Sequence, residues 1–448
     1  MNLLVNCHFN GWISMKITEK WLFTLLVIVL ILVTLIFLKK STFDFDAGYN
    51  TKLSVQQMSE DIGQLKDMIQ NEHPLYKSNP EKVDELFSEI EQSITEEKYL
   101  SEFSRVLASN IAKMNDAHTW IELVNGNLTL PLIFKHIDNA YYSLDKYKDI
   151  NAGDRIINIG GIPVSRVYQS YSEQISSENE FWKRETFESY FIDIGRIIEL
   201  GGKITLQGGI KIKYESDGQI METTLLNNEL ITEQNNREIR NKILYGDAQI
   251  NTINGVRLDF YQSKSYARFV LRNCEYTSYY AMKVDELFKG INENGISNII
   301  IDLRGNLGGT TEVVDYFKAR LDAFNSYLSR RNESELFLIV LVDNGTFSGG
   351  VHFAGVMKYD YNALLIGQPT GDSLFGYGNV QFGQLTNSTL YYSVSSSKFN
   401  GYGKNQTYSD SIYPDIITYY NPMDYVLGND IDMNIAEFII SIREDLKK

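Results

Sequence analysis

Cysteine, histidine and positive charge are all scarce in this chain of 448 residues. Its two cysteines, Cys7 and Cys274, lie on opposite sides of a long apolar run, so we expect no intramolecular disulfide and a fold that depends on its hydrophobic core. The 42 basic residues are outnumbered by 57 acidic ones, and the net charge of −15 argues against a nucleic acid partner. The length allows two or three domains.

The apolar run covers residues 21–38, WLFTLLVIVLILVTLIFL, and carries no charge. It corresponds to roughly 27 Å of helix, close to the thickness of a bilayer core, so we predict a transmembrane helix between a tail (1–20) and a linker (39–54). A cleaved signal peptide is the alternative, but residues 39–43 (KKSTF) offer no small-x-small cleavage site. Lysines flank the run on both sides, so charge does not fix its orientation.

The segment LFLIVLVDNGTFSGG (336–350) has the pattern of a buried strand, a turn and the start of a helix. Ser348 follows the turn, at the predicted amino end of the helix. A helix N-terminus and free backbone N–H groups stabilise negative charge, which suits a nucleophile. The alternative is that Ser348 only caps the helix, as serine commonly does.

A second segment has the same organisation: the strand NIIIDL (298–303), the turn RGNLGG (304–309) and an amphipathic helix. With a third strand at 363–367 the order is βαβαβ, which brings both turns to one edge of a parallel sheet. Gly308 and Gly309 can let backbone N–H groups approach a substrate carbonyl. A phosphate-binding loop is disfavoured, because neither turn has the GxxxxGK[ST] or GxGxxG pattern.

Three regions complete the predicted organisation. Residues 55–118 are expected to be helical, with two apolar stripes: Met58, Ile62, Leu65, Met68 and Ile69, then Phe103, Val106, Leu107 and Ile111. Residues 119–245 are expected to form a β module of short strands from 130 to 225, with a hairpin at Asp217–Gly218 and a connecting loop over the polar stretch 227–240. Residues 246–448 are the expected catalytic domain, where Asp302 and Arg304 are predicted to pair and orient the second turn.

Six segments, in this order, resemble the C-terminal-processing (tail-specific) serine peptidase family, which includes the tricorn core protease. They are NDAHTW (115–120), GDRIINIGGIPV (153–164), NIIIDLRGNLGG (298–309), TFSGG (346–350), IGQPTG (366–371) and YPDI (413–416). The resemblance implies an α/β fold with a crotonase-like spiral core. It also implies a PDZ-like module, which either grips a substrate's C-terminal tail as an added strand or serves as a scaffold covering the active site. Such peptidases usually work outside the cytoplasm, which implies a single-pass protein of the cell membrane with an extracellular catalytic domain.

The family has a Ser–Lys branch and a Ser–His branch. The lysine position of the first branch aligns with Ser373, and no lysine lies between Lys358 and Lys398, so the Ser–His branch is favoured. The resemblance then assigns Ser348 as nucleophile, His118 of the Asp-x-His-Thr motif as general base, and Gly349 with Gly308 or Gly309 as oxyanion donors.

Two assignments have alternatives. His352 is the rival base, but its side chain should project along its own helix, away from the open side of the nucleophile. The third catalytic member is expected at Asp410, with Tyr408 as the closer positional match, because the glutamate usual before the Pro-Asp motif is absent.

We therefore expect a membrane-anchored serine peptidase that acts on peptides or proteins, with no cofactor and no metal. One alternative is an inactive relative that binds peptide or a hydrophobic ligand in the same cleft. The other is a structural or interaction protein of the cell envelope, favoured if the two glycine-rich turns lie far apart.

Overall fold

The computed structural model describes residues 51–123, 128–190, 194–203, 209–226, 229, 231–246, 252–401 and 407–447. The predicted tail, the transmembrane segment 21–38 and most of the linker lie outside these residues. Among the helices that are described, none has the length and apolarity needed to cross a membrane.

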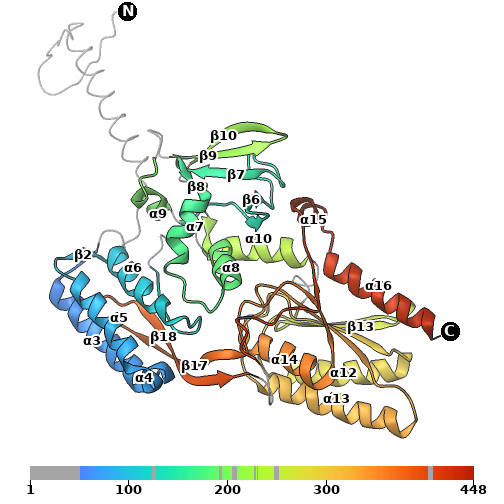
Figure 1. Cartoon of the computed structure of the whole chain (residues 1–448). Coiled ribbons are helices and arrows are strands. Elements are labelled where there is room, and N and C mark those ends of the chain that lie inside the picture. Colours follow the sequence, from blue (N-terminus) through green and yellow to red (C-terminus); the bar gives the residue numbers. More distant parts are fainter. Residues whose placement is uncertain are drawn as a thin grey trace, which may run out of the picture.

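The first region is helical, as predicted (Figure 1). Its elements are β1 (Lys52–Leu53), α3 (Val55–Glu72), α4 (Pro74–Ser78), α5 (Pro80–Ser93), β2 (Lys98–Tyr99), α6 (Leu100–Ile111) and the 3₁₀ helix η1 (Ala112–Met114). The apolar stripes of α3 and α6 face one core together with α5. Ser54 starts α3 with a capping box, in which its hydroxyl accepts from the Gln57 N–H.

The middle region contains an antiparallel sheet in the order β10-β9-β7-β6-β5, with β8 paired to β7. Its strands are β5 (Phe134–Ile137), β6 (Ala140–Ser143), β7 (Arg155–Ile159), β8 (Ile162–Pro163), β9 (Gly209–Ser216) and β10 (Gln219–Leu226). The predicted hairpin at Asp217–Gly218 is confirmed: both residues have positive φ, as a tight hairpin turn requires.

Two predictions for this region are wrong. The stretch 130–225 also holds the helices α7 (Val164–Ser172), α8 (Glu180–Tyr190) and α9 (Ile194–Glu199). The predicted loop 227–240 instead contributes β11 (Ile231–Thr232), which pairs with β4 (Leu128–Thr129), and most of α10 (Glu233–Tyr245). The sequence of α10 has no apolar stripe that would predict a helix. The helix is instead anchored by the buried Arg240, which forms ion pairs with Glu185 and Glu188 of α8.

The last region is built on a six-stranded sheet in the order β12-β13-β14-β15-β16-β19. The strands are β12 (Val256–Tyr261), β13 (Tyr266–Leu271), β14 (Asn298–Asp302), β15 (Phe337–Val342), β16 (Leu364–Gly367) and β19 (Ile416–Ile417). Neighbouring strands from β13 to β19 are parallel, and β12 is antiparallel to β13. The predicted βαβαβ order is thus confirmed, and the turns after β14 and β15 leave the same edge.

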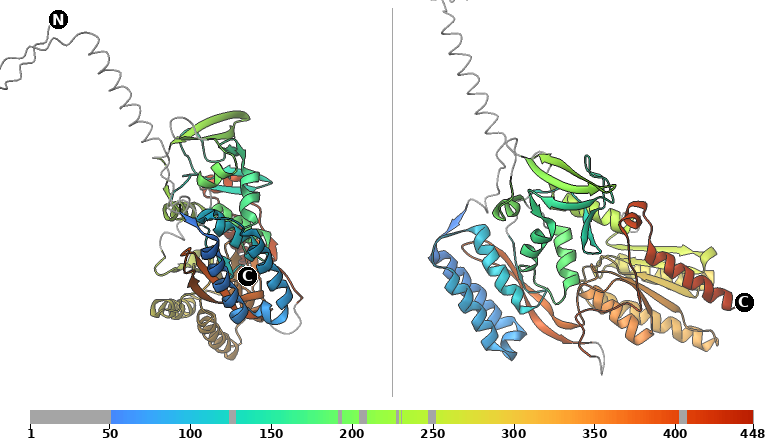
Figure 2. Two further views of the ribbon diagram at one scale, coloured as in Figure 1. Left: turned by 90° about the vertical axis from the view of Figure 1, so that its left-hand side faces the viewer. Right: turned by 45° about the horizontal axis from the view of Figure 1, so that its top comes forward.

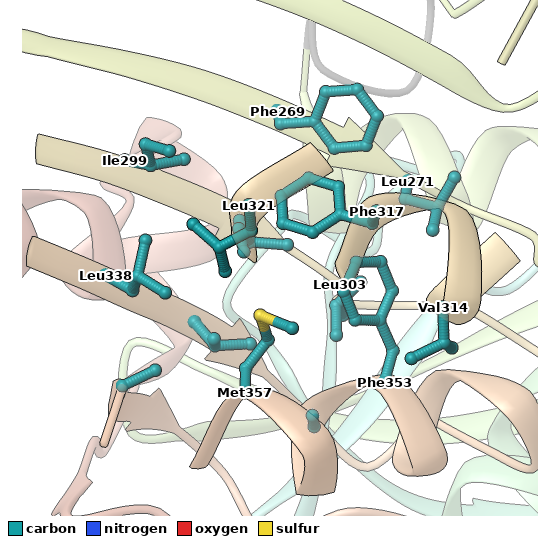
Figure 3. Packing of buried hydrophobic residues seen from close by; sticks show 14 of the residues in the cluster. Phe269, Leu271, Ile299, Leu303, Val314, Phe317, Leu321, Leu338, Phe353 and Met357 are labelled. Atoms are coloured by element: carbon teal, nitrogen blue, oxygen red, sulfur yellow. The ribbon is translucent and has the colours of Figure 1, made fainter. Parts of the chain in front are cut away.

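Helices cover both faces of this sheet (Figure 1). They are α12 (Ser278–Asn294), α13 (Glu312–Arg330) and α14 (Gly349–Tyr361) on one face and α16 (Ile431–Leu446) on the other, with the short η3 (Gln262–Lys264) and α15 (Pro422–Leu427) beside them. Figure 3 shows Phe317 of α13 between Phe269 of β13 and Phe353 of α14, with ring centroids 5.7 and 5.1 Å away. Removing such a buried ring costs about 3–5 kcal/mol, so this core fixes both turns firmly.

A long hairpin connects the last region to the first. It consists of β17 (Phe375–Gln384) and β18 (Tyr391–Asn400), and β18 pairs with β3 (Trp120–Ile121). Figure 2 shows the hairpin, in orange, running from the catalytic half to the N-terminal helices in blue. Its residues Leu390 and Val394 are buried in the same core as α3, α5 and α6. The helical region therefore shares a core with the hairpin of the catalytic half. Because β3 pairs with β18, the residues just before Trp120 lie beside that hairpin.

Candidate active site

Ser348 has a strained backbone, with φ 50° and ψ −121°. It stands between the end of β15 and the first residue of α14, at the N-cap position, but its side chain makes no capping hydrogen bond. The alternative that Ser348 serves as a helix cap therefore lacks the bond that would define it. Non-glycine residues held in such conformations cluster at functional sites, and a nucleophile on a sharp strand-to-helix turn is a known case.

The turn that holds Ser348 is fixed by buried hydrogen bonds. The Asp343 carboxylate accepts from the N–H groups of Gly305 and Gly345 at 2.8 and 3.0 Å. The Phe347 N–H donates to the carbonyl of Asn306 at 2.8 Å. The two glycine-rich turns are thus in direct contact, and the condition that favoured an envelope interaction protein is not met.

Gly308 has to be glycine for this contact. Its φ is 93°, and a Cβ at this position would lie 2.6 Å from the Ser348 Cβ and 2.7 Å from the Gly349 nitrogen. The predicted pairing of Asp302 with Arg304 is also confirmed: the two side chains form bonds of 3.0 and 2.9 Å behind the turn.

His118 reaches the same place from the N-terminal region. The Asp116 carboxylate accepts the His118 backbone N–H at 2.9 Å, and the Ser393 hydroxyl of β18 donates to the His118 carbonyl at 2.7 Å. The imidazole stacks on the ring of Phe347, with centroids 4.6 Å apart. His118 is therefore held from both sides and packed against the residue that precedes Ser348.

Ser348, His118, Gly308 and Gly309 line one cavity of about 860 Å³. Aromatic side chains form much of the remaining wall: Trp120, Trp182, Phe347 and Phe382. No lysine is among the lining residues that the structure describes, and Ser373, at the aligned lysine position, donates its hydroxyl proton to the Ser409 carbonyl.

His352 lies outside the residues that line the cavity. It is on α14, and the charged groups that act on it are Asp315 and Asp360. Burial lowers the pKa of His352, which the two carboxylates partly offset. Its surroundings therefore belong to the helical layer and not to the cavity.

Gly308 and Gly309, the predicted oxyanion donors on the second turn, differ in the bonding of their backbone N–H groups. The Gly308 N–H donates to the Asn306 side chain at 2.8 Å, so it is already used. Gly349 is the first residue of α14, whose N–H has no acceptor within the helix. The Gly309 backbone lies against Gly349, where a Cβ built on Gly349 would be 3.0 Å from the Gly309 nitrogen. Gly349 and Gly309 are the pair positioned to act together.

Asp116 is the acidic neighbour of His118 within the motif. Its Oδ1 lies 3.9 Å from the His118 Nδ1, which is too long for a hydrogen bond. Its Oδ2 is 2.9 Å from Nε2 of the buried His73, whose Nδ1 accepts the Leu75 N–H and thereby leaves the proton on Nε2. Burial would raise the pKa of Asp116, but the hydrogen bond from His73, His118 and the hydroxyls of Thr119 and Ser395 lower it overall.

Glu178 and Asp372 place two more carboxylates here. Glu178 accepts the Ala117 N–H at 3.1 Å, and Asp372 accepts the Ser348 N–H at 3.0 Å. Burial, followed by the charges of Asp372 and Asp116, raises the pKa of Glu178 well above its usual range. Burial also raises the pKa of Asp372, although His118 and the N–H groups of Ser373 and Ser348 oppose this effect.

Asp410, the predicted third member, is not among the lining residues. Its carboxylate has the Tyr413 hydroxyl as a partner at 3.3 Å, and Tyr408 is 72% exposed. Sequence reasoning missed Glu178, Asp372 and His73. Asp372 directly follows the IGQPTG segment, which could have identified it. His73 precedes a proline, which indicates only a helix end, and no pattern in the sequence identifies Glu178.

Comparison with known proteins gives one family match and several similar structures. Residues 271–418 match the model described as peptidase family S41. No curated protein matches the chain by sequence. The structure of mature CPAF complexed with lactacystin is similar, with 12% identity, a TM-score of 0.60 and coverage of 88% of this chain and 99% of the other. Another structure of mature CPAF has 12% identity and a TM-score of 0.57 over 86% of this chain and 96% of the other.

At this identity the likeness to CPAF shows a shared mixed α/β fold. The family match is more informative, because the matched range contains Ser348 and both glycine-rich turns, while His118 lies outside it. Residues 271–418 therefore resemble peptidase family S41, and this match supports a serine-type peptidase.

Proposed function

We propose that this peptidase uses Ser348 as nucleophile and His118 as general base. The observation that carries the proposal is the strained turn of Ser348 at the end of β15, with the serine and His118 lining one cavity. The substrate is a peptide or protein, as the family implies. An extended chain with apolar side chains suits a cavity walled by Trp120, Trp182 and Phe382.

The chemistry follows from these positions. His118 takes the Ser348 proton as the Ser348 oxygen bonds to the substrate carbonyl carbon, and the N–H groups of Gly349 and Gly309 stabilise the oxyanion. His118 then gives the proton to the departing amine as the C–N bond breaks. Water, activated by the same imidazole, hydrolyses the acyl-enzyme and frees Ser348.

Asp116 is our candidate for the third member, in place of Asp410. It is buried, and the bond to His73 fixes one of its oxygens while the other faces the His118 ring at 3.9 Å. Catalytic hydrogen bonds are often long before substrate binds and shorten in the complex. The acid would then come from the Asp-x-His motif itself.

We further propose that the protein is anchored by a transmembrane helix at 21–38, with the catalytic part outside the cell, and that the β5–β10 sheet is a PDZ-like module. The anchor is supported by the uncharged apolar run, and the module by the GDRIINIGGIPV segment, which covers β7 and β8. Protease added to intact cells should digest the region after Lys40 and leave a membrane-bound stub. Protection of that region from the protease would mean that the catalytic part lies inside the cell.

An inactive relative that binds peptide is the second candidate. It is favoured by one observation: both ring nitrogens of His118 are buried and have no hydrogen-bond partner among the described residues. An imidazole in this state has not yet formed the bonds of a working triad.

Labelling with a fluorophosphonate distinguishes the two candidates. The full chain, purified in mild detergent, should be labelled at Ser348 and should cleave an unstructured protein substrate. Ser348→Ala should abolish both signals and change the melting temperature by no more than about 1–2 °C, because it removes one half-buried hydroxyl. Ser373→Ala is the matched control and should retain labelling. A folded protein without labelling would support the inactive relative.

A further inference from the structure

Asp116, His118 and Glu178 form a compact set of potential metal ligands. One ligand atom from each of these residues lies within 4.8 Å of the other two. Asp116 and His118 come from the turn before β3, and Glu178 comes from the loop before α8. Three separate bonds anchor this arrangement: His73 to Asp116, Asp116 to the His118 N–H and Glu178 to the Ala117 N–H.

The set contains polar atoms whose bonding capacity is unused. Both ring nitrogens of His118 and the Oε2 of Glu178 are buried and lack a hydrogen-bond partner within the described parts of the chain. Buried polar atoms are normally paired, because leaving one unpaired costs about 1–3 kcal/mol. One His118 ring nitrogen and a Glu178 carboxylate oxygen belong to the same set, so a single cation between them would give each of these two residues a partner.

The charge around His118 points the same way. Three buried or largely buried carboxylates, those of Asp116, Glu178 and Asp372, surround one histidine. No lysine or arginine among the described residues forms an ion pair with any of the three, and the pairs that Asp116 makes are to His73 and His118. A bound cation would offset the mutual repulsion of these carboxylates.

The ligand types indicate which cation fits. One imidazole nitrogen with two carboxylate oxygens is a set that suits zinc and related divalent transition metals, whereas magnesium and calcium prefer oxygen ligands alone. Tetrahedral zinc holds its ligands about 2.0–2.2 Å from the metal, so the set must contract on binding. Glu178 can close the gap, since its Oε2 has no bond to break.

We propose that Asp116, His118 and Glu178 bind a zinc-like divalent cation that reversibly inhibits the enzyme. A neutral imidazole has only one acceptor nitrogen, so a metal bound to either nitrogen of His118 leaves the other carrying a proton and unable to accept that of Ser348. This site departs from the expectation that the protein binds no metal. The inhibitory effect rests on the proposed roles of Ser348 and His118, but the binding itself does not.

Zinc binding is tested first without activity. The full chain with Ser348→Ala, in detergent, is titrated with zinc chloride by calorimetry, on a background of Cys7→Ser and His8→Ala that removes the N-terminal thiol and imidazole. We expect one site. Glu178→Gln should weaken it at least about 100-fold, more than the loss of a residue that only orients a ligand. Glu122→Gln is the matched control: Glu122 lines the same cavity outside the set, and binding should not change.

Inhibition is tested second, with the same substitutions in the chain that retains Ser348. Zinc should suppress substrate cleavage, a chelator should restore it, and magnesium at the same concentration should have no effect. Cleavage by the Glu178→Gln variant should resist zinc at least about 100-fold better than cleavage by the Glu122→Gln variant.

The outcomes separate the two proposals. Zinc binding that Glu178→Gln leaves unchanged, or no binding in a folded protein, overturns the metal site whatever the activity. Metal binding without any cleavage in the absence of zinc overturns the proposed peptidase mechanism and leaves the site standing. Cleavage that zinc stimulates would refute inhibition.

Discussion

Two buried acidic clusters in this molecule differ in whether basic side chains neutralise their charge. In the first, Glu185 and Glu188 of α8 are neutralised by Arg240 of α10 and Lys135 of β5, through ion pairs of 2.7–3.5 Å. Burial opposes ionisation, but Arg240 and then Lys135 lower the pKa of Glu185 to about 2.

The second cluster surrounds His118, and its carboxylates have no lysine or arginine partner among the described residues. Burial and mutual repulsion there raise the pKa of Glu178 and Asp372. The first cluster joins the β module to α10, and its ion pairs leave neither buried carboxylate without a cationic partner. Unpaired buried charge beside Ser348 is costly to keep, and perturbed carboxylates of this kind are a mark of functional sites. The first cluster therefore has the properties of a structural ion-pair network, and the second has those of a functional site.

The largest effect should come from the cluster around His118. His118→Ala should reduce kcat/KM by about 10⁴-fold, comparable to the loss of Ser348, because the members of such a unit do not act additively. The melting temperature should change little. His352→Ala, on the adjacent helix, is the control and should retain activity. If His352→Ala inactivates the enzyme and His118→Ala does not, the assignment of the base is wrong.

In the neutralised cluster the main effect should be on stability. Arg240→Met removes a cation that is 2% exposed and leaves two buried glutamates with Lys135 alone. Breaking a buried ion pair from one side costs about 3–5 kcal/mol, so urea unfolding should shift by that amount. Arg257→Met, which removes a more exposed pair with Asp259, should cost under about 1 kcal/mol. Equal effects of the two variants would remove the basis for the comparison.

Glu178→Gln should stabilise the protein at neutral pH. Because its folded pKa is raised, Glu178 supports stability below its unfolded value of about 4.3 and loses that contribution as the pH rises through the folded value. Glutamine does not titrate, so the variant should gain about 1 kcal/mol over the wild type at pH 7.5 and no advantage near pH 4. Thermal melts across this range provide the measurement. A variant that is less stable at pH 7.5 would mean that Glu178 is paired after all.

The smallest effect should be that of Asp410→Asn. Since this carboxylate lies outside the cavity wall and is bonded to Tyr413, activity should stay within about threefold of the wild type. Asp116→Asn, measured beside it, should lose about 100-fold or more because it disturbs the orientation of the base. The reverse ranking would return the third role to Asp410.

Much of the catalytic half could be predicted because its signals are local. Apolar strands at 298–303 and 337–342, each followed by a glycine-rich turn and an amphipathic helix, define the βαβαβ order without reference to distant residues. Ser348 follows directly from that order. His118 could be named only through its resemblance to a family motif, because no local pattern shows that β3 pairs with β18.

The failures have physical causes of the same kind. The helix α10 was taken for a loop because its stability comes from the buried ion pairs of Arg240, which leave no apolar stripe in the sequence. Glu178 was missed because a glutamate is ordinarily exposed, and its burial beside Asp116 is a tertiary property. The sequence places the hairpin β17–β18 in the catalytic domain alone, although Leu385, Leu390 and Val394 are buried in the core of the N-terminal helices.

That hairpin has a consequence for how the enzyme is made. The bond between Ser393 and the His118 carbonyl joins residues 275 positions apart in the chain. Contacts of such separation form late, since the entropy of closing a long loop must be overcome first. On the ribosome, His118 emerges long before Ser393, so this bond to the His118 carbonyl cannot form until most of the chain has been synthesised. A chain interrupted before residue 393 would lack this bond, and His118 would then be held from the Asp116 side alone.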